Sequence, residues 1–543
     1  MLIHKKAKAV LFRLKNPSRI TTVIPTAKEF IHNGTNMVAV PHRPDETRVL
    51  RNLGFEVPDP MPVHYEWPKA SGRYDPFQAQ RETASFLSMH SRAFCLNGMG
   101  TGKTNAALWA FDYMRNNKQV KKMLVVCPLS TMERTWADSV FQTFPHLDFA
   151  VLHGSRERRL KLLKEDVHVY IINIDGIRTI EKELAKREDI DLVVVDELAM
   201  ARNGSTERWK SLNTICNKQT PRRVWGMTGS PTPNSPLDAW AQCKLVTPDN
   251  PSVPKYFGRF RDLVMRQITQ FKWVPRPEAN DIIHNMMQPA IRFSLDDCTD
   301  LPEQTFITRD VEMTKEQKQA YKEMMSKLAT EVSGGQILAV NEAVKANKLI
   351  QIACGVAYDA QGGTIEIPNK PRLDVLTELI EESEGKVIVF VPLTGALEHV
   401  AGEVSKLYAT TAELVANRIV GGAALADEVA IVHGATSKND RDRIFGDFQK
   451  QVNPRVLVAN ASTMSHGLTL TAATTIIWYA PVHSNEVYEQ ACARVRRPGQ
   501  TRTTVIAHIA GSDIERRVYK RLQDKQSMQG VLLDMMKEGA EID

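Results

Sequence analysis

One glycine-rich segment has the residue types and the setting of a phosphate-binding loop. Asn97–Thr104 reads Asn-Gly-Met-Gly-Thr-Gly-Lys-Thr, follows the short apolar run Ala93–Leu96 and precedes a helix expected over Asn105–Met114. A loop between a strand and a helix lets backbone N–H groups face an anion, and the start of the helix adds its positive pole. The segment therefore predicts a site for the phosphates of a nucleoside triphosphate.

Side chains in this segment have separate expected roles. Gly100 and Gly102 let the backbone turn sharply, Lys103 would reach the β- and γ-phosphates of ATP, and the Thr104 hydroxyl would ligate Mg²⁺. The usual pattern begins with glycine, whereas this one begins with Asn97. Because asparagine tolerates left-handed backbone angles better than most residues, we expect the loop to keep its shape.

An acidic pair follows a later apolar strand. Leu192–Val195 is continuously apolar and is followed directly by Asp196 and Glu197. Active groups in open parallel sheets gather where the strands end. Asp196 would therefore hold Mg²⁺ through water, and Glu197 would polarise the attacking water. Alone, the pair would be interpreted as an exposed turn; with the phosphate loop upstream, it predicts the second half of a hydrolysis site.

A basic segment near the end of the chain offers cations to the same reaction. Gln490, Arg494 and Arg497 are spaced by four and three residues, which predicts one helical face. Two guanidinium groups on one face repel each other unless an anion neutralises them. We interpret them as arginine fingers that contact the γ-phosphate from across a cleft. A solvated basic face is the alternative.

Apolar runs alternate with helical stretches in two blocks of the chain, and these elements must position the residues above. Strands that are apolar almost throughout are typical of sheets covered on both faces. Their alternation with helices predicts parallel, doubly wound sheets of the α/β class. The predicted strands are Met123–Cys127, Tyr170–Ile172, Leu192–Val195 and Val224–Met227 in the first block, and Val387–Val391, Ala430–Val432, Val456–Ala459, Thr475–Trp478 and Val505–Ile509 in the second.

The length of 543 residues allows several cores. Pro58, Pro60, Pro62 and Pro68 are interpreted as a linker that follows a first small unit. We expect five regions: a small N-terminal accessory domain at 1–70, a first lobe that binds ATP at 71–250, a helical linker or protrusion at 251–370, a second lobe at 371–511 and a C-terminal helical brace at 512–543.

Composition favours an intracellular protein that is compatible with a nucleic-acid partner. The chain has 70 Lys and Arg against 63 Asp and Glu, a mild excess. Its seven scattered cysteines include no CxxC pair, which favours buried thiols over a zinc ribbon. No secretory signal and no run of about 20 apolar residues occurs, so we expect no membrane contact.

The first 22 residues contain six cations and no acidic residue, which is typical of an exposed basic strand or of an arm that contacts phosphates. The six are Lys5, Lys6, Lys8, Arg13, Lys15 and Arg19.

In their order along residues 74–530, these motifs resemble the Swi/Snf-type branch of the superfamily-two helicase-like ATPases. Asn97–Thr104 resembles the family's Asp-Glu-Met-Gly-Leu-Gly-Lys-Thr, and Asp196–Ala199 stands where the family has Asp-Glu-Ala-His. Asp75–Gln78 resembles the adenine-reading motif, with Gln78 on the base. The resemblance implies two RecA-like lobes with helical insertions and a small N-terminal domain.

The resemblance also implies residues that contact DNA or couple the lobes. Thr228 and Ser230 resemble the motif that links hydrolysis to lobe movement, and Pro289 with Arg292 matches the stretch that joins the lobes. Ser462–Leu468, which includes His466, is similar to the corresponding motif of short bacterial and phage members. The expected DNA-contacting residues are Pro128, Ser130, Thr436, Ser462 and Thr463.

The resemblance implies an ATPase that is stimulated by DNA and moves along one strand of double-stranded, forked or branched DNA. We expect it to remodel DNA structures or protein–DNA complexes, as a monomer, in the cytoplasm of a bacterial host cell. Phosphate contacts do not depend on base sequence, which suits such a motor. Two alternatives stay open: a helicase that separates strands of DNA or RNA, and an ATP-regulated module for binding or annealing DNA.

Overall fold

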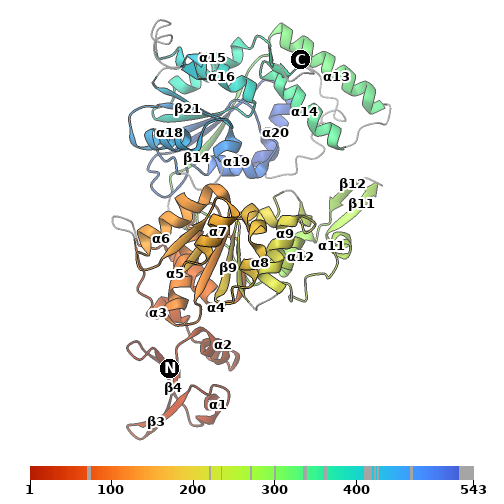
Figure 1. The fold of residues 1–543 in the computed structure, drawn as a ribbon. Helices are drawn as coiled ribbons and strands as arrows, with labels where there is room; N and C mark the ends of the chain where they lie inside the picture. Colours follow the sequence, from red (N-terminus) through yellow and green to blue (C-terminus); the bar gives the residue numbers. More distant parts are fainter. Residues whose placement is uncertain are drawn as a thin grey trace. The chain divides into compact units, whose positions relative to one another are not determined.

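The computed structural model describes residues 1–69, 75–218, 222–233, 235–269, 272–298, 301–333, 339–358, 364–408, 419–420, 423–424, 427–464 and 469–524. The chain divides into two compact units, Met1–Thr299 and Asp300–Asp543, and each is described by itself. Figure 1 shows the elements of both. Among the described residues, no helix is both long enough and apolar enough to cross a membrane.

The first unit begins with a small antiparallel sheet. Its strands lie in the order β1-β2-β4-β3. Helices α1 (Ser18–Thr21) and α2 (Pro44–Asn52) contribute Ile20 and Leu50 to one shared core with the sheet residues Val10 and Val38. The strand bounds are β1 Leu2–His4, β2 Ala9–Arg13, β3 Lys28–His32 and β4 Thr35–Pro41.

The remainder of the first unit is built on a parallel sheet in the order β13-β5-β10-β9-β6-β8-β7. The four strands predicted for this block are confirmed, and β7 and β13 are additional to the prediction. The bounds are β5 Arg92–Cys95, β6 Lys122–Cys127, β7 Phe149–Leu152, β8 Val169–Asn173, β9 Ile190–Asp196, β10 Arg223–Met227 and β13 Ala290–Ile291.

Alternate residues of each central strand enter two separate cores. In β9, Leu192 and Val194 pack with α4, α5 and α6, whereas Val193 and Val195 pack with α7 to α12. Because strand side chains alternate between faces, a doubly covered strand has to be apolar throughout. The helices are α4 Gln78–Met89, α5 Lys103–Asn116, α6 Asp138–Thr143, α7 Arg156–Leu163, α8 Glu181–Ala185, α9 Glu207–Asn213, α10 Ala239–Val246, α11 Phe257–Val264 and α12 Ala279–Met286.

The proline-rich stretch ahead of this lobe is packed against it. Pro60–His64 forms helix α3, and Met61 is fully buried in the core that contains α4 and α5. Proline suits the first turn of a helix because the N–H that it lacks would have no partner there. The interpretation of these prolines as a plain linker is therefore wrong for residues 60–64.

The segment between α10 and α13 contains strands as well as helices. β11 (Met265–Thr269) and β12 (Lys272–Pro275) form an antiparallel hairpin, and β13 pairs with β5 as an edge strand of the main sheet. The five region boundaries given above, including a helical linker at 251–370, stay predictions.

The second unit contains another parallel sheet, in the order β14-β23-β22-β17-β21-β20. All five strands predicted for this block are confirmed, and β14 adds an edge. Two parallel α/β sheets with helices thus confirm the predicted fold class. The bounds are β14 Gln304–Asp310, β17 Lys386–Phe390, β20 Val429–Val432, β21 Val456–Ala459, β22 Ala473–Trp478 and β23 Thr504–Ala510.

Helices and two small strand pairs complete the described part of this unit. The helices are α13 Lys315–Ser333, α14 Ala339–Ala353, α15 Lys370–Glu381, α16 Thr394–Ser405, α18 Lys438–Lys450, α19 Asn485–Cys492 and α20 Asp513–Gln523. The pairs are β15 (Val356–Tyr358) with β16 (Thr364–Glu366), and β18 (Ile419–Val420) with β19 (Ala423–Ala424).

A buried ion pair fastens α20 to the rest of the second unit. Arg372 on α15 donates to both carboxylate oxygens of Glu515 on α20, at 2.8 and 2.9 Å, and both side chains are almost wholly buried. Glu515 also accepts from the Gly511 amide and the Ser512 hydroxyl. Ser512 directly precedes the helix, but its hydroxyl donates to this carboxylate and does not cap the helix.

We predict that Glu515→Gln destabilises the second unit by about 3–5 kcal/mol, because it leaves the Arg372 guanidinium buried without its counter-charge. The matched control is Asp310→Asn, which breaks the exposed pair between Arg516 and Asp310. That change should cost less than about 1 kcal/mol. Guanidinium-induced unfolding measures both, and equal losses for the two variants would contradict a special role for the buried pair.

Candidate functional site

Three neighbouring strands end together in the first unit, and the predicted hydrolysis residues follow them. Met227 of β10 is in register with Cys95 of β5 on one side and with Asp196 of β9 on the other. The phosphate loop begins just after Cys95, and Thr228 follows Met227 directly. The backbone pairing of parallel strands therefore brings the loop, the acidic pair and the coupling motif to one edge of one sheet.

The phosphate loop has the conformation that its glycines predict. Gly100 and Gly102 both lie in the left-handed region, with φ of 78° and 80°, and α5 begins at Lys103 immediately after Gly102. The Lys103 ammonium donates to the carbonyl oxygens of Asn97 and Gly98 at 2.8 and 2.9 Å. The lysine thus spans the loop that it closes, with its charge directed into the turn.

Asn97 supports this loop through its side chain and does not need the left-handed backbone that asparagine tolerates. Its backbone is not among those with positive φ. The buried amide donates to the Thr83 hydroxyl at 2.8 Å and accepts from the Phe293 amide at 3.0 Å. Pairing of β5 with β13 continues here, since the Gly98 amide donates to the Phe293 carbonyl. Asn97 therefore ties the loop to α4 and to the segment after β13.

The glutamine that contacts the phosphate loop is Gln80. Its buried amide donates to the Thr101 carbonyl at 3.1 Å and accepts from the Phe77 amide at 3.0 Å. Gln78, the residue expected on the adenine, is exposed and donates to Glu82 one turn along the same helix. The two glutamines are two residues apart, so the helix points them in different directions. A shift of the motif by two residues would have found Gln80.

Asp196 is held by a tryptophan from another part of the lobe. The Trp136 indole donates to one carboxylate oxygen at 2.9 Å, and the Glu197 amide donates to the other at 3.0 Å. Burial raises the pKa of Asp196, while the Trp136 hydrogen bond, the Lys103 charge and the Glu197 amide oppose this rise. Trp136 lies fully buried in the π-helix Met132–Ala137. The spacing of residues along the sequence does not reveal that Trp136 contacts Asp196.

Glu197 has a strained backbone, with φ of 52° and ψ of 53°. A left-handed conformation is uncommon for a residue other than glycine, and such strain concentrates at functional sites. The neighbouring strand β10 ends at Met227, and Thr228, which follows it, is fully buried and donates its amide to the Cys95 carbonyl. The Thr228 hydroxyl accepts from the Ser230 amide at 3.3 Å. Asn234, which follows this motif in the chain, lies outside the described residues.

The residues expected to contact DNA in the first unit differ in exposure. Ser130 is exposed beyond the end of β6, whereas Pro128 is buried and its carbonyl accepts from Thr131. In the basic helix α7, Arg159 is buried and bonds the Leu152 and Gly154 carbonyls. Pro128 and Arg159 therefore serve the fold, and Ser130 is the side chain placed to reach a partner.

The basic motif of the second unit is less helical than its spacing predicts. Helix α19 ends at Cys492, so Gln490 lies on it while Arg494 and Arg497 follow it. The expectation of one helical face is wrong, because the chain turns after Cys492. Arg494 is buried, and Arg497 donates to the Ala493 carbonyl at 3.0 Å and to the Thr469 hydroxyl at 3.2 Å.

The electrostatics of this motif do not resemble a solvated basic face. Burial lowers the pKa of Arg497 to about 10. Gln490 is also buried, and its amide donates to Glu486 at 3.2 Å. A desolvated guanidinium gains from an incoming anion, which is the behaviour expected of an arginine that meets a phosphate.

The other predicted residues of the second unit follow β20 and β21, which are neighbours in the sheet. Thr436 is half-buried and its hydroxyl accepts from the His433 amide at 3.0 Å. Ser462 is exposed, whereas the Thr463 hydroxyl donates to Asn460 at 2.7 Å. The parallel pairing of β20 with β21 brings these two loops to one sheet edge. His466 lies outside the described residues.

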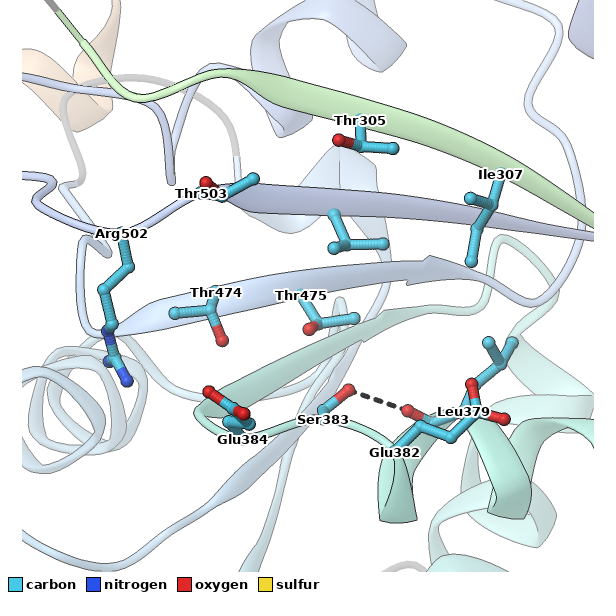
Figure 2. Close-up of a pocket in the computed structure, with 11 residues that line it drawn as sticks. Thr305, Ile307, Leu379, Glu382, Ser383, Glu384, Thr474, Thr475, Arg502 and Thr503 are labelled. Atoms are coloured by element: carbon cyan, nitrogen blue, oxygen red, sulfur yellow. Dashed lines mark hydrogen bonds between the residues drawn. The ribbon is translucent and has the colours of Figure 1, made fainter.

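A hollow of about 590 Å³ in the second unit lies elsewhere (Figure 2). Its lining includes Thr305, Thr474 and Thr503, near the starts of β14, β22 and β23, together with Glu384 and Arg502. Among its lining residues are none of those predicted to bind ATP or DNA. The hollow is therefore separate from the loops that follow β20 and β21.

We predict that Gln80→Ala raises the KM for ATP about tenfold, because it removes the hydrogen bond to the Thr101 carbonyl of the phosphate loop and the one from the Phe77 amide that holds Gln80 in place, each worth roughly 1 kcal/mol or less in net terms. Gln78→Ala is the matched control on the same helix and should change KM less than twofold. Steady-state ATP hydrolysis with both variants decides between the glutamines. A larger loss for Gln78→Ala would show that the adenine-reading role belongs to Gln78.

We predict that Trp136→Phe lowers kcat for ATP hydrolysis about tenfold or more, because it removes a donor to a charged carboxylate while an aromatic ring still fills the core. Trp225→Phe is the control: Trp225 is also fully buried in this lobe, but its indole donates to the His90 carbonyl. Thermal melting should fall in both variants and kcat in the first alone. Parallel losses of kcat would contradict the assignment.

Comparison with known proteins agrees with this geometry. A model of the SNF2-related domain matches residues 84–354, and a model of the helicase conserved C-terminal domain matches residues 371–499. Two relatives are the putative protein p41 of an Acyrthosiphon pisum secondary endosymbiont phage, 24% identical, and an uncharacterized ATP-dependent helicase of Mycoplasma pneumoniae, 23% identical. A third is the SWI/SNF-related regulator of chromatin subfamily A-like protein 1 of Xenopus laevis, 23% identical.

The matches cover different shares of these proteins. They include 81%, 79% and 85% of this chain, respectively, and 94% of the phage protein, but only 39% and 44% of the other two. The chain therefore spans less than half the length of the cellular relatives. The chain belongs to the SNF2-related family of helicase-like ATPases.

Proposed function

We propose that this protein is an ATP-driven translocase that moves along double-stranded, forked or branched DNA and remodels DNA structures or protein–DNA complexes. The observation that carries the proposal is the convergence of the phosphate loop, Asp196 and Thr228 at one sheet edge, in a chain whose second unit carries the buried Arg494 and the half-buried Arg497 after α19. An enzyme with this division hydrolyses ATP only when the two units close on one nucleotide.

The residues of the first unit suit ATP with Mg²⁺. The Asp196 carboxylate and the Thr104 hydroxyl are hard oxygen ligands of the kind that Mg²⁺ prefers, and they lie beside the charge of Lys103. When bound, the ion would neutralise charge on the β- and γ-phosphates. Glu197 would orient and polarise the attacking water, and its strained backbone is typical of a functional position.

In the second unit, Arg494 and Arg497 would supply the positive charge that the γ-phosphate needs as it is transferred. Their position after the helix, in a turn bonded to Thr469, places them close to the loop that precedes β22. A movement of that loop would therefore move the arginines, and a movement of the arginines would move the loop. We propose that this contact joins DNA binding to hydrolysis within the unit.

DNA contacts would come from loops that follow the strands of both sheets. Ser130 and Ser462 are exposed, and their hydroxyls can donate to phosphate oxygens. Thr436 and Thr463 would position these loops, because their hydroxyls already bond the backbone. Backbone contacts of this kind carry no sequence information, which suits a motor that has to pass every base. The phage relative supports a role in an infected bacterial cell, and we propose that the protein acts as a monomer.

We predict that duplex or forked DNA increases ATP turnover by the wild-type protein at least tenfold. Lys103→Ala should abolish turnover with and without DNA, since the loop loses the charge that meets the phosphates. The measurement is phosphate release with single strands, blunt duplexes, forks and four-way junctions. A turnover rate that is indifferent to every DNA would overturn the proposal.

Movement along DNA needs a readout of its own. Displacement of a third strand from a triplex, without separation of the underlying duplex, is the outcome expected of a translocase. Separation of a tailed duplex would instead make the protein a strand-separating helicase. ATP-dependent affinity without either displacement would make it a binding or annealing module.

A further inference from the structure

The small N-terminal sheet has one covered face and one open face, and its register assigns each side chain to one of them. Val10 pairs with Val40 and Phe12 with Val38, and these four residues form the core with α1 and α2. Neighbours along each strand point to the opposite face. The residues between and beside them, such as Leu11, therefore belong to the face that these helices leave open.

Apolar side chains cross this open face from strand to strand. Leu2 lies opposite Leu11, and Met37 lies opposite Phe30. Leu2 is 63% exposed and Phe30 is 38% exposed. Exposed apolar groups on adjacent strands form a surface that a partner can cover.

Basic side chains share the open face with these apolar groups. Arg13 lies opposite Met37, and Lys28 lies opposite Ala39, so both are on the same face as Phe30. Both are exposed. The nearby acidic residue of β3, Glu29, lies opposite the core residue Val38 and accepts from the Thr21 hydroxyl of α1. Glu29 thus points to the covered face.

The turn between β1 and β2 adds more positive charge at one end of the sheet. Lys5, Lys6 and Lys8 are exposed there, and Lys8 is left-handed with φ of 45°. Of the six cations near the N-terminus, Arg19 alone is engaged on the helix side, where it donates to the Leu53 carbonyl at 3.0 Å. The described residues of the open face and of this turn include cations and apolar groups but no carboxylate.

We propose that the open face of the N-terminal sheet binds single-stranded DNA. Cations attract the phosphates, and apolar and aromatic side chains between them accept bases that are not stacked in a duplex. A duplex would present its phosphates but hide its base faces, and so would leave Phe30 without a partner. An anionic membrane is the alternative ligand for a basic apolar surface, but the amphipathic helix typical of such binding is replaced here by a flat sheet.

This inference extends the proposed function without depending on the ATP site. If the motor moves on branched DNA, a sheet that holds one strand would keep the enzyme at the point where the duplex opens. It rests on the proposed function only in the choice of DNA as the nucleic acid. The binding itself needs no nucleotide, and it is measured without ATP.

The affinity test uses the full-length protein and a fluorescein-labelled oligothymidylate. Arg13→Gln with Lys28→Gln should raise the Kd about tenfold and reduce the salt slope by about 1.4, since each cation contributes roughly 0.7 with single strands. Phe30→Ala should raise the Kd at least fivefold and leave the salt slope unchanged. The matched control, Arg43→Gln with Arg48→Gln, removes the same charge from exposed residues at and within α2 and should change the Kd less than twofold.

A second measurement locates the strand on the protein. Oligonucleotides with 5-iododeoxyuridine are cross-linked to the wild-type protein by light, and the modified peptides are identified by mass spectrometry. We expect the cross-link at Phe30 or His32 of β3. Cross-links confined to residues 75–524, or equal affinities for all variants, would overturn the inference, as would co-sedimentation with anionic phosphatidylserine vesicles without oligonucleotide binding. DNA-stimulated ATP turnover in the same preparations reports separately on the proposed function.

Discussion

The register of three parallel strands is the constraint on which the first half of the site depends. Cys95, Met227 and Asp196 lie side by side because β5, β10 and β9 are hydrogen-bonded with no irregularity between these pairs. A shift of one residue in either pairing would turn each side chain of the moved strand to the opposite face. The two cores resist such a shift, because both faces of these strands are buried. The packing that stabilises the sheet therefore also fixes the geometry of the site.

Polar contacts around the phosphate loop convert this framework into a defined site. Gln80, Asn97 and Trp136 are each buried, and each side chain makes a hydrogen bond to a group of the site or its surroundings: the Thr101 carbonyl, the Phe293 amide and the Asp196 carboxylate. A loop held from several sides loses less conformational freedom when its ligand arrives. The segment after β13 is one of these supports. Since this segment leads toward the second unit, the support links the nucleotide loop to the chain that joins the units.

The sequence predicts most of the fold because the central strands are apolar throughout. Short or partly polar strands are not predicted in this way, because they contain no continuous apolar run. β13 has two residues, and the edge strand β14 reads Gln-Thr-Phe-Ile-Thr-Arg-Asp. The phosphate loop was predictable because its glycines act through the local backbone. Asn97 and Trp136 were not, since their roles arise from Phe293 and Asp196, which lie far away along the sequence. The spacing of Arg494 and Arg497 predicts that the helix continues through both residues, whereas the helix ends before them.

The N-terminal sheet contrasts with the lobes in how it uses apolar residues. In the lobes, apolar groups on both faces of a strand are needed because helices cover both faces. In the N-terminal sheet, one set of apolar residues is sufficient for the core with α1 and α2, yet Leu2, Leu11 and Phe30 provide a second set on the other face. Exposed apolar groups on a sheet favour aggregation unless charges interrupt them. Arg13 and Lys28 interrupt them with a single sign of charge, which keeps the surface in water and selects an anionic partner.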